Sequence, residues 1–309
     1  MVVSSSAFYR SNLIFLIALI CGITLPQGFR AGKTLILPAL MVIITITLLK
    51  FPRGFFRHPG SLLYSSVKSN VMNYLVLGNF IILAGAFLIR KQELWVGMVL
   101  IAAMPSSLEI ILLGNLSRIE KISIFTALAG TYLGALLIIP LAGLCFFKYI
   151  HLNHWNIIVV ILGLILLPML VSRIIIEQEW DKIIKKHEET AINCSSFIVF
   201  YAITANSINF LMNWSSDLFI ICLIAFVSTF LFYFAIRQAG FYFHGQENNI
   251  NMFILLGTMK DCGLAGGIGL TVFNQEAAIP PLIFAIFTFI YMNWLKYRFR
   301  HIINNSSDN

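Results

Sequence analysis

Thr258–Gly269 reads T-M-K-D-C-G-L-A-G-G-I-G, and it interrupts an apolar stretch, residues 249–272, that is long enough to cross a lipid bilayer. Four glycines fall within seven residues of this segment, and glycine weakens a helix because it loses more conformational freedom on folding than other residues do. A helix that is interrupted at membrane depth frees N–H and C=O groups, which then need an ion, a substrate or water. We therefore predict a broken transmembrane helix, with the break at Gly263, Gly266 and Gly267.

A second interruption occurs in residues 94–115, where Met104–Glu109 reads M-P-S-S-L-E. Pro105 lacks a backbone N–H donor, and its ring clashes with the preceding helical turn. Matching broken helices in the two halves of a membrane protein point to the binding site of a transporter. The alternative is an ordinary proline kink, combined with glycines that let neighbouring helices pack closely.

The whole chain has the composition of a membrane protein. Of its 309 residues, 59% are hydrophobic and only 11% are charged, and the mean hydropathy is +0.88. A soluble domain needs charged residues at roughly a quarter of its positions. We predict an all-α membrane protein with ten transmembrane helices, at residues 12–26, 34–50, 64–89, 94–115, 121–147, 155–176, 192–212, 217–237, 249–272 and 277–297.

The basic residues between these helices predict the orientation of the chain. One side of the membrane would carry Arg10, Lys50, Arg53, Arg57, Arg118, Lys121, Arg173, Lys182, Lys185, Lys186, Arg237, Lys296, Arg298 and Arg300. The other side would carry only Arg30, Lys33, Arg90, Lys91 and Lys148. Since loops rich in Lys and Arg stay in the cytoplasm, we expect both termini to be cytoplasmic. The expected location is the inner membrane of a bacterium.

Several functional classes receive no support from the sequence. The net charge is +8, but no nucleic-acid-binding motif is present and the basic residues do not form one patch. The five cysteines lie in apolar stretches without metal-binding spacing. No H-E-x-x-H or G-x-S-x-G motif occurs. We therefore expect no nucleic-acid partner, no metal, no cofactor and no enzymatic activity.

The span count suggests two similar halves. The most charged segment, residues 177–189, lies close to the middle of the chain and divides the ten predicted helices into five plus five. Five is an odd number, so two similar halves must insert in opposite senses, as the inverted repeats of many secondary transporters do. The first repeat would comprise residues 1–150 and the second residues 151–309.

Three ionisable side chains fall deep within the predicted helices, and all three lie at the two breaks: Glu109, Lys260 and Asp261. An ionisable group at the centre of a bilayer costs roughly 3 kcal/mol unless it is paired or hydrated. These residues either form a structural ion pair that holds the breaks together or take part directly in binding.

Both breaks resemble the bile acid:sodium symporter family, whose members carry organic anions. Gly97–Pro105 looks like the family's approach to the proline of its fourth helix, and Thr258–Ala265 resembles the family pattern G-M-Q-N-S-G-L-A. Ala277–Pro281 resembles the start of the family's tenth helix. The resemblance implies that broken helices four and nine cross near the centre of the bilayer. It also implies a core of helices 3–5 and 8–10 beside a panel of helices 1, 2, 6 and 7.

The sequence departs from this family at the positions that ligate sodium. A serine and an asparagine of the family correspond here to Ile110 and Ile111, and a glutamate corresponds to Leu256. A glutamine ligand corresponds to Lys260, and a supporting glutamine of the third helix corresponds to Asn73. Hard cations need several oxygen ligands, which isoleucine and leucine lack, so the family's sodium sites are not expected here.

Our hypothesis is that the Lys260 ammonium replaces a sodium ion, with Glu109 and Asp261 as its counter-charges. Lys260 would then exchange a proton during alternating access, in a proton-coupled or uncoupled carrier of a small organic anion. Further residues expected to line the binding site are Asn73, Ser106, Ser107, Thr258, Asn206 and Asn209. Interhelical hydrogen bonds are the alternative role for the last two.

Two other functions stay open. One is a non-transporting sensor or interaction subunit built on a degenerate transporter fold. The other is a sodium-coupled organic anion symporter whose ion sites have shifted. The oligomeric state is not determined by the sequence.

Overall fold

The computed structural model describes residues 5–29, 33–51, 59–117, 119–146, 154–212 and 215–305, and every regular element in these ranges is helical. In chain order the elements are α1 (Ser5–Thr24), the 3₁₀ helix η1 (Pro26–Phe29), α2 (Lys33–Leu48), α3 (Pro59–Asn70), the π-helix η3 (Val71–Gly78), α4 (Asn79–Leu88), α5 (Gln92–Ala103), α6 (Ile110–Leu116), α7 (Lys121–Phe146), α8 (His154–Glu177), α9 (Asp181–Ile184), α10 (Glu188–Met212), α11 (Ser216–Phe226), the π-helix η4 (Val227–Leu231), α12 (Phe232–Tyr242), α13 (Glu247–Thr258), α14 (Cys262–Ile268), the π-helix η5 (Gly269–Phe273), the 3₁₀ helix η6 (Glu276–Ala278) and α15 (Ile279–Asn305).

The structure confirms an all-helical chain with helices of membrane-spanning length. Five helices are long and apolar enough to cross a membrane: Ser65–Leu88, Lys121–Phe146, Glu188–Ile208, Ser216–Tyr242 and Glu276–Phe299. Shorter apolar helices occupy Tyr9–Thr24, Thr34–Leu48, Gln92–Ala103 and Cys262–Phe273. Each of these elements overlaps one of the ten predicted segments. That all ten segments cross a membrane, and that the two halves are inverted repeats, stay predictions.

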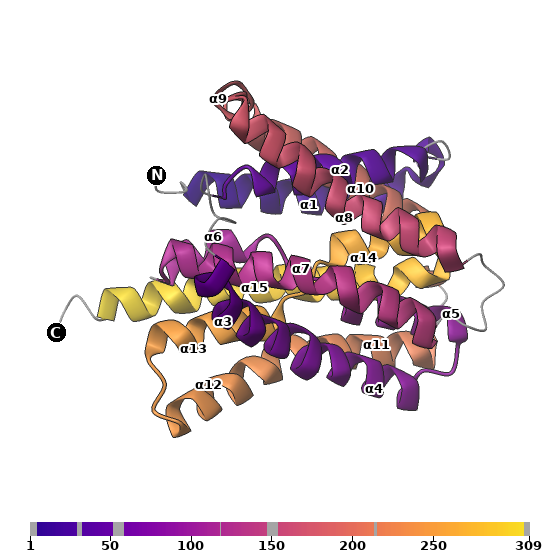
Figure 1. Cartoon of the computed structure of the whole chain (residues 1–309). Coiled ribbons are helices and arrows are strands. Elements are labelled where there is room, and N and C mark those ends of the chain that lie inside the picture. Colours follow the sequence, from indigo (N-terminus) through magenta and orange to yellow (C-terminus); the bar gives the residue numbers. More distant parts are fainter. Residues whose placement is uncertain are drawn as a thin grey trace.

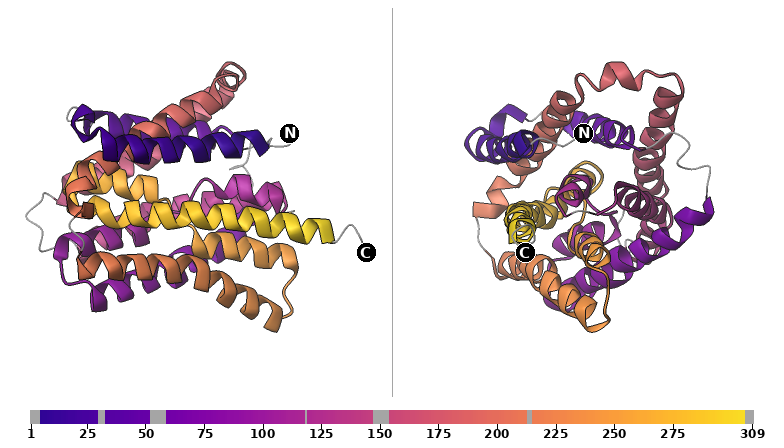
Figure 2. Two further views of the ribbon diagram at one scale, coloured as in Figure 1. Left: turned by 180° about the vertical axis from the view of Figure 1, so that it is seen from behind. Right: turned by 90° about the vertical axis from the view of Figure 1, so that its left-hand side faces the viewer.

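The helices pack in two groups (Figures 1 and 2). In the first group, α10 packs against α1 and α2, and α2 packs against α8. In the second group, α3 packs on α7, α12 on α13, α4 on α5, and α15 on α11, α14 and α5. The two groups meet where α14 contacts α2 and α10, where α15 contacts α10, and where α7 contacts α8. Because few elements join them, a boundary between two helical groups runs along the molecule.

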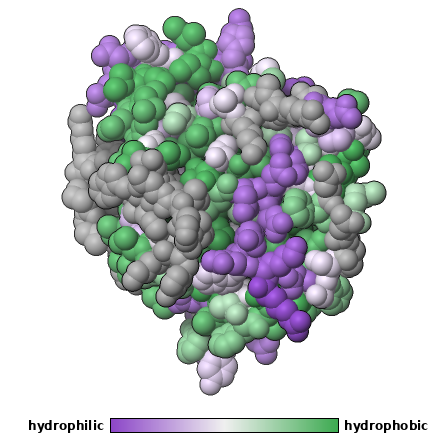
Figure 3. All heavy atoms as spheres, turned by 90° about the vertical axis from the view of Figure 1, so that its right-hand side faces the viewer, coloured by the Kyte–Doolittle hydropathy of each residue, from purple (hydrophilic) through white to green (hydrophobic). Residues whose placement is uncertain are grey.

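The surface agrees with a lipid environment around the flanks of the bundle. Large apolar side chains are exposed on several helices, among them Phe87 at 83% and Leu137 at 77% of their surface. A band of hydrophilic residues lies on the end of the molecule seen in Figure 3. The α4–α5 connection is at the same end (Figure 1), and its Arg90 and Lys91 are exposed. The helix α1 begins and α15 ends at the other end (Figure 1).

The predicted position of the second break needs a correction. The helix is interrupted between Thr258, where α13 ends, and Cys262, where α14 begins. Gly266 and Gly267 lie inside α14, and Gly263 lies in its first turn. A Cβ atom on Gly267 would lie 2.5 Å from a methyl group of Leu40 on α2. These glycines therefore permit close packing between helices and do not unwind the chain themselves.

Candidate functional site

The two interruptions cross each other and are joined by backbone hydrogen bonds. Ser106 and Lys260 form an isolated antiparallel bridge. The Asp261 N–H donates to the Pro105 carbonyl oxygen at 3.0 Å, and the Ser107 N–H donates to the Met259 carbonyl oxygen at 3.3 Å. Each interrupted segment thus provides hydrogen-bonding partners for backbone groups of the other segment that have no partner within a helix. The structure brings together two segments that lie about 150 residues apart in the sequence.

The side chain of Lys260 is buried at this crossing, with 3% of its surface exposed. Its Nζ atom donates to the carbonyl oxygens of Ala102, at 2.8 Å, and Met104, at 2.9 Å. It also lies 4.6 Å from the centre of the Tyr74 ring, a distance at which a cation is attracted by the ring face. The last carbonyl groups of a helix lack intrahelical partners and carry the negative end of the helix dipole. The ammonium group therefore compensates the C-terminal end of α5.

Asn73 supports the same end of α5 from the π-helix η3. Its Nδ2 atom donates to the Met104 carbonyl oxygen at 3.2 Å, and its side chain is fully buried. π-Helical turns inside longer helices are frequent at functional sites, because they re-aim side chains. Asn73 is thus a neighbour of the Lys260 ammonium, and it does not line the cavity described below.

The expected ion pairs of Lys260 are not formed. Within the part of the chain that the structure describes, no ion pair joins Lys260 to Glu109 or to Asp261. The physical reason is the extended backbone at Met259, with φ −122° and ψ 114°. Successive side chains of an extended segment point to opposite sides, so the Lys260 ammonium reaches α5 while the Asp261 carboxylate faces the other way. The ammonium is held by carbonyl groups and not by carboxylates.

Asp261 caps the helix that follows the break. Its Oδ1 atom accepts a hydrogen bond from the Leu264 N–H at 2.9 Å, which is the usual contact of an aspartate at the N-cap of a helix. Its Oδ2 atom accepts from the Tyr132 hydroxyl of α7 at 3.1 Å. Tyr132 therefore fixes the direction in which the carboxylate faces.

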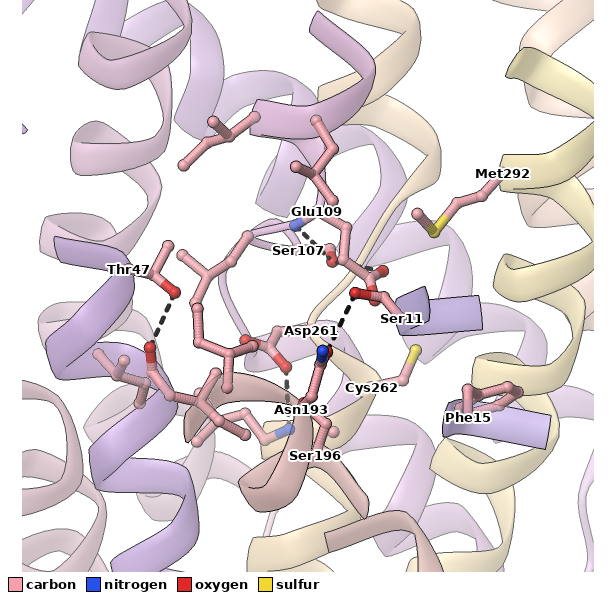
Figure 4. Close-up of a pocket in the computed structure, with 18 of the residues that line it drawn as sticks. Ser11, Phe15, Thr47, Ser107, Glu109, Asn193, Ser196, Asp261, Cys262 and Met292 are labelled. Atoms are coloured by element: carbon pink, nitrogen blue, oxygen red, sulfur yellow. Dashed lines mark hydrogen bonds between the residues drawn. The ribbon is translucent and has the colours of Figure 1, made fainter. Parts of the chain in front are cut away.

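Glu109 lies at the end of the first interruption, one residue before α6. Its Oε2 atom accepts a hydrogen bond from the Ser107 hydroxyl at 3.1 Å, and its own N–H donates to the Ser107 Oγ atom at 3.3 Å. The Glu109 side chain is not covered by neighbouring atoms and projects into the same space as Asp261 (Figure 4). The crossing thus presents two carboxylates on one side and the ammonium group on the other.

This space is a cavity of about 710 Å³ between the two groups of helices (Figure 4). One wall comes from α1, α2 and α10 and the other from the crossing, α7 and α15; their polar lining residues are Ser11, Asn12, Thr47, Ser107, Glu109, Asn193, Ser196, Lys260, Asp261 and Thr288. Lys50, Lys121, Lys185, Glu188 and Glu189 line it near the ends of their helices. Among the described residues, none of the opposite connections Arg90–Gln92 and Asn274–Glu276 contributes to it. The cavity therefore reaches from the crossing toward the end that bears the termini.

The structure places the residues predicted to form the site in two groups. Those that line the cavity are Ser107, Glu109, Lys260, Asp261 and Gly263. Those that do not are Asn73, Pro105, Ser106, Thr258, Asn206, Gly266 and Gly267. Ser106 and Thr258 are buried at the breaks, and the Thr258 hydroxyl donates to Ile254 within α13. Asn206 donates to Ala202 within α10, and the side chain of Asn209 lies outside the described part of the chain.

Ser11 and Asn12 of α1 were not predicted as part of the site. The polar residues of α10 were candidates as a group, and of these Asn193 and Ser196 line the cavity whereas Asn206 does not. Ser11 of α1 donates to Asn193 at 3.3 Å, and Asn12 donates to Asn293 of α15 at 2.8 Å. The i, i+3 spacing of Asn193 and Ser196 was a sequence signal as clear as that of Asn206 and Asn209. Tertiary packing alone decides which end of α10 lines the cavity.

No model of a known protein family matches this chain, and no curated protein matches its sequence significantly.

Proposed function

We propose that this chain is a secondary transporter that moves a small organic solute across a membrane by alternating access, without sodium. The proposal rests on the hydrogen bonds of the Lys260 ammonium to the end of the broken helix α5. The ammonium group at the end of α5 is a hydrogen-bonding partner for carbonyl groups that would otherwise need a bound cation. Because the charge is covalently attached, the site needs no sodium ion to keep the two breaks together.

The surroundings of the crossing support the absence of sodium. Ile110, Ile111 and Leu256 are buried and apolar at the positions where the bile acid:sodium symporter family carries polar ligands. Within this proposal the chain is a divergent relative of that family, with the ten-helix topology and cytoplasmic termini predicted from its sequence. The cavity reaches toward the end that bears the termini and thus opens toward the cytoplasm.

Two features of the helices support the proposed inverted repeat. In each half the third predicted helix contains a π-helical segment, η3 in the first and η4 in the second. In each half the next helix is the broken one, and the two breaks pair with each other in antiparallel fashion. Two halves related by a two-fold axis in the membrane plane produce such an antiparallel crossing.

The arrangement of the helices supports alternating access. The cavity lies at the boundary between the group formed by α1, α2, α8 and α10 and the group that contains the crossing. A movement of one group against the other would close the cavity at the end bearing the termini and open it at the opposite end. Such rocking around a fixed site is the general mechanism of transporters with inverted repeats.

The resemblance implies an organic anion as substrate, and that stays a prediction. The ammonium group expected to hold the anion is bound to the carbonyl oxygens of Ala102 and Met104. The substrate class therefore has to be inferred from the side chains that face the cavity.

Counterflow in proteoliposomes tests the proposed function. Vesicles with the purified protein are loaded with unlabelled phenethylammonium or 3-phenylpropionate, and uptake of the same labelled solute is measured in potassium buffer with and without sodium. We expect uptake above that of protein-free vesicles for one of the solutes, and we expect sodium to leave it unchanged. Uptake that strictly requires sodium contradicts the role of Lys260, and the absence of counterflow for both solutes contradicts transport.

A further inference from the structure

The inner end of the cavity carries negative charge. Glu109 and Asp261 both face it, whereas the Lys260 ammonium is turned toward the carbonyl oxygens of α5. Among the described residues, Glu109 accepts a side-chain hydrogen bond at Oε2 alone, from the Ser107 hydroxyl, whereas each oxygen of Asp261 accepts one, from the Leu264 N–H and the Tyr132 hydroxyl. Each carboxylate oxygen has lone pairs for more than one hydrogen bond, so both side chains can accept further donors from a ligand.

The basic residues of the cavity do not offset this charge at its inner end. Lys50, Lys121 and Lys185 lie near the ends of their helices, away from the crossing. The Lys50 ammonium pairs with Glu188 at 2.7 Å, and Lys185 pairs with Asp181 at 3.0 Å. An anion bound at the inner end would thus lie beside two carboxylates, which repel it.

An independent observation is the aromatic wall of the same cavity. Phe15, Phe200 and Phe289 line it together and come from α1, α10 and α15. The ring centroids of Phe15 and Phe200 are 4.7 Å apart, and those of Phe15 and Phe289 are 4.9 Å apart. The face of an aromatic ring attracts a cation and disfavours an anion. This wall offers an anion no hydrogen-bond donor and suits an aromatic or apolar body attached to the cationic group that the carboxylates bind.

The remaining lining sets the shape of the ligand. The cavity volume of about 710 Å³ lies within the range that accommodates drug-sized molecules. Apolar residues of both walls, including Leu40, Ile44, Ile124 and Val199, line it beside the aromatic rings. A ligand that fills this space has an apolar body in addition to its charged group.

We infer that the solute is an organic cation, an amine or guanidinium compound with an aromatic or other apolar body, whose N–H groups donate to Glu109 and Asp261. The inference rests on the proposed function for its claim of transport, whereas its claim of binding stands on the cavity alone. Charge-assisted hydrogen bonds from nitrogen to carboxylate are among the strongest available to a protein.

Calorimetric titration of the purified protein in detergent tests the binding claim. Phenethylammonium and 3-phenylpropionate have similar size and the same ring but opposite charge. We expect phenethylammonium to bind more tightly. We expect Glu109→Gln and Asp261→Asn each to weaken its binding by about tenfold, as the loss of one charge-assisted contact does. Asparagine is as good an N-cap as aspartate, so Asp261→Asn leaves the cap of α14 in place.

Glu247→Gln provides the matched control. Glu247 is exposed in the first turn of α13 and does not line the cavity, so this variant is expected to bind phenethylammonium as the unmodified protein does. The inference is overturned if 3-phenylpropionate binds more tightly, if phenethylammonium does not bind saturably, or if neither cavity variant weakens its binding. Binding of phenethylammonium without counterflow leaves the inference standing and refutes transport.

Discussion

The Lys260 ammonium lies 2.8 Å from the carbonyl oxygen of Ala102, which precedes it by 158 residues in the chain. The contact joins the end of one broken helix to the break in another. The Ala102 and Met104 carbonyls accept from the same Nζ atom, so one side chain compensates the C-terminal end of α5. A buried lysine with two carbonyl partners is thus a structural element of the crossing.

Replacement of Lys260 by methionine is expected to destabilise the protein. Methionine fills a similar volume but donates no hydrogen bond, so the carbonyl groups of α5 lose their partner. We expect the free energy of unfolding to fall by about 2 kcal/mol or more, the usual range for a lost hydrogen bond to a charged group, with a lower temperature of thermal unfolding in detergent. Lys182→Met is the control, since Lys182 is an exposed residue of α9 whose surface ion pair with Glu179 contributes little. Equal stability of the two variants would refute the structural role of Lys260.

Gly267→Ala is expected to disturb the contact between α14 and α2. The added Cβ atom would lie 2.5 Å from one methyl carbon of Leu40 and 3.0 Å from a methyl carbon of Ile36. Overpacking of this kind costs about 1–3 kcal/mol, which thermal unfolding would detect. Gly163→Ala is the matched control, because nothing lies within 4 Å of a Cβ atom built there and alanine favours a helix more than glycine does. A variant at Gly267 that is as stable as the Gly163 variant would show that the two helices do not pack as closely as described.

Cys262 reports on access to the cavity, which it lines at the start of α14. In a variant that retains this cysteine alone, we expect thiol reagents to react faster from the side that bears the termini. A positively charged methanethiosulfonate is expected to react faster than a negatively charged one, because Glu109 and Asp261 concentrate cations near the thiol. Mass spectrometry of labelled inside-out and right-side-out vesicles measures both rates.

The control for this experiment is a variant that retains Cys194 alone. Cys194 is exposed on α10 and does not line the cavity, so its preference for the positive reagent should be weaker. The same preference at both cysteines would show that the charges of the cavity do not act on Cys262.

The sequence by itself determined the class of protein and the places where its helices break. Long apolar blocks form helices in any environment that excludes water, because their backbone groups must then bond to each other. Proline lacks a backbone N–H donor in any surroundings, so Pro105 interrupts the hydrogen bonding of a helix. The charged pair Lys260–Asp261 marked the second break, although the glycines that follow it remain helical.

Only the tertiary structure decided what the buried charges bind and which side chains meet the cavity. The direction of the Lys260 side chain follows from the extended backbone at the crossing, and this geometry depends on pairing with a segment about 150 residues away. The choice of Asn193 and Ser196 over Asn206 likewise depends on how α10 lies against α1 and α15. Local sequence sets the propensity of a segment to form a helix, but the partners of a buried polar group are fixed by contacts between distant segments, because only those contacts determine where each helix lies.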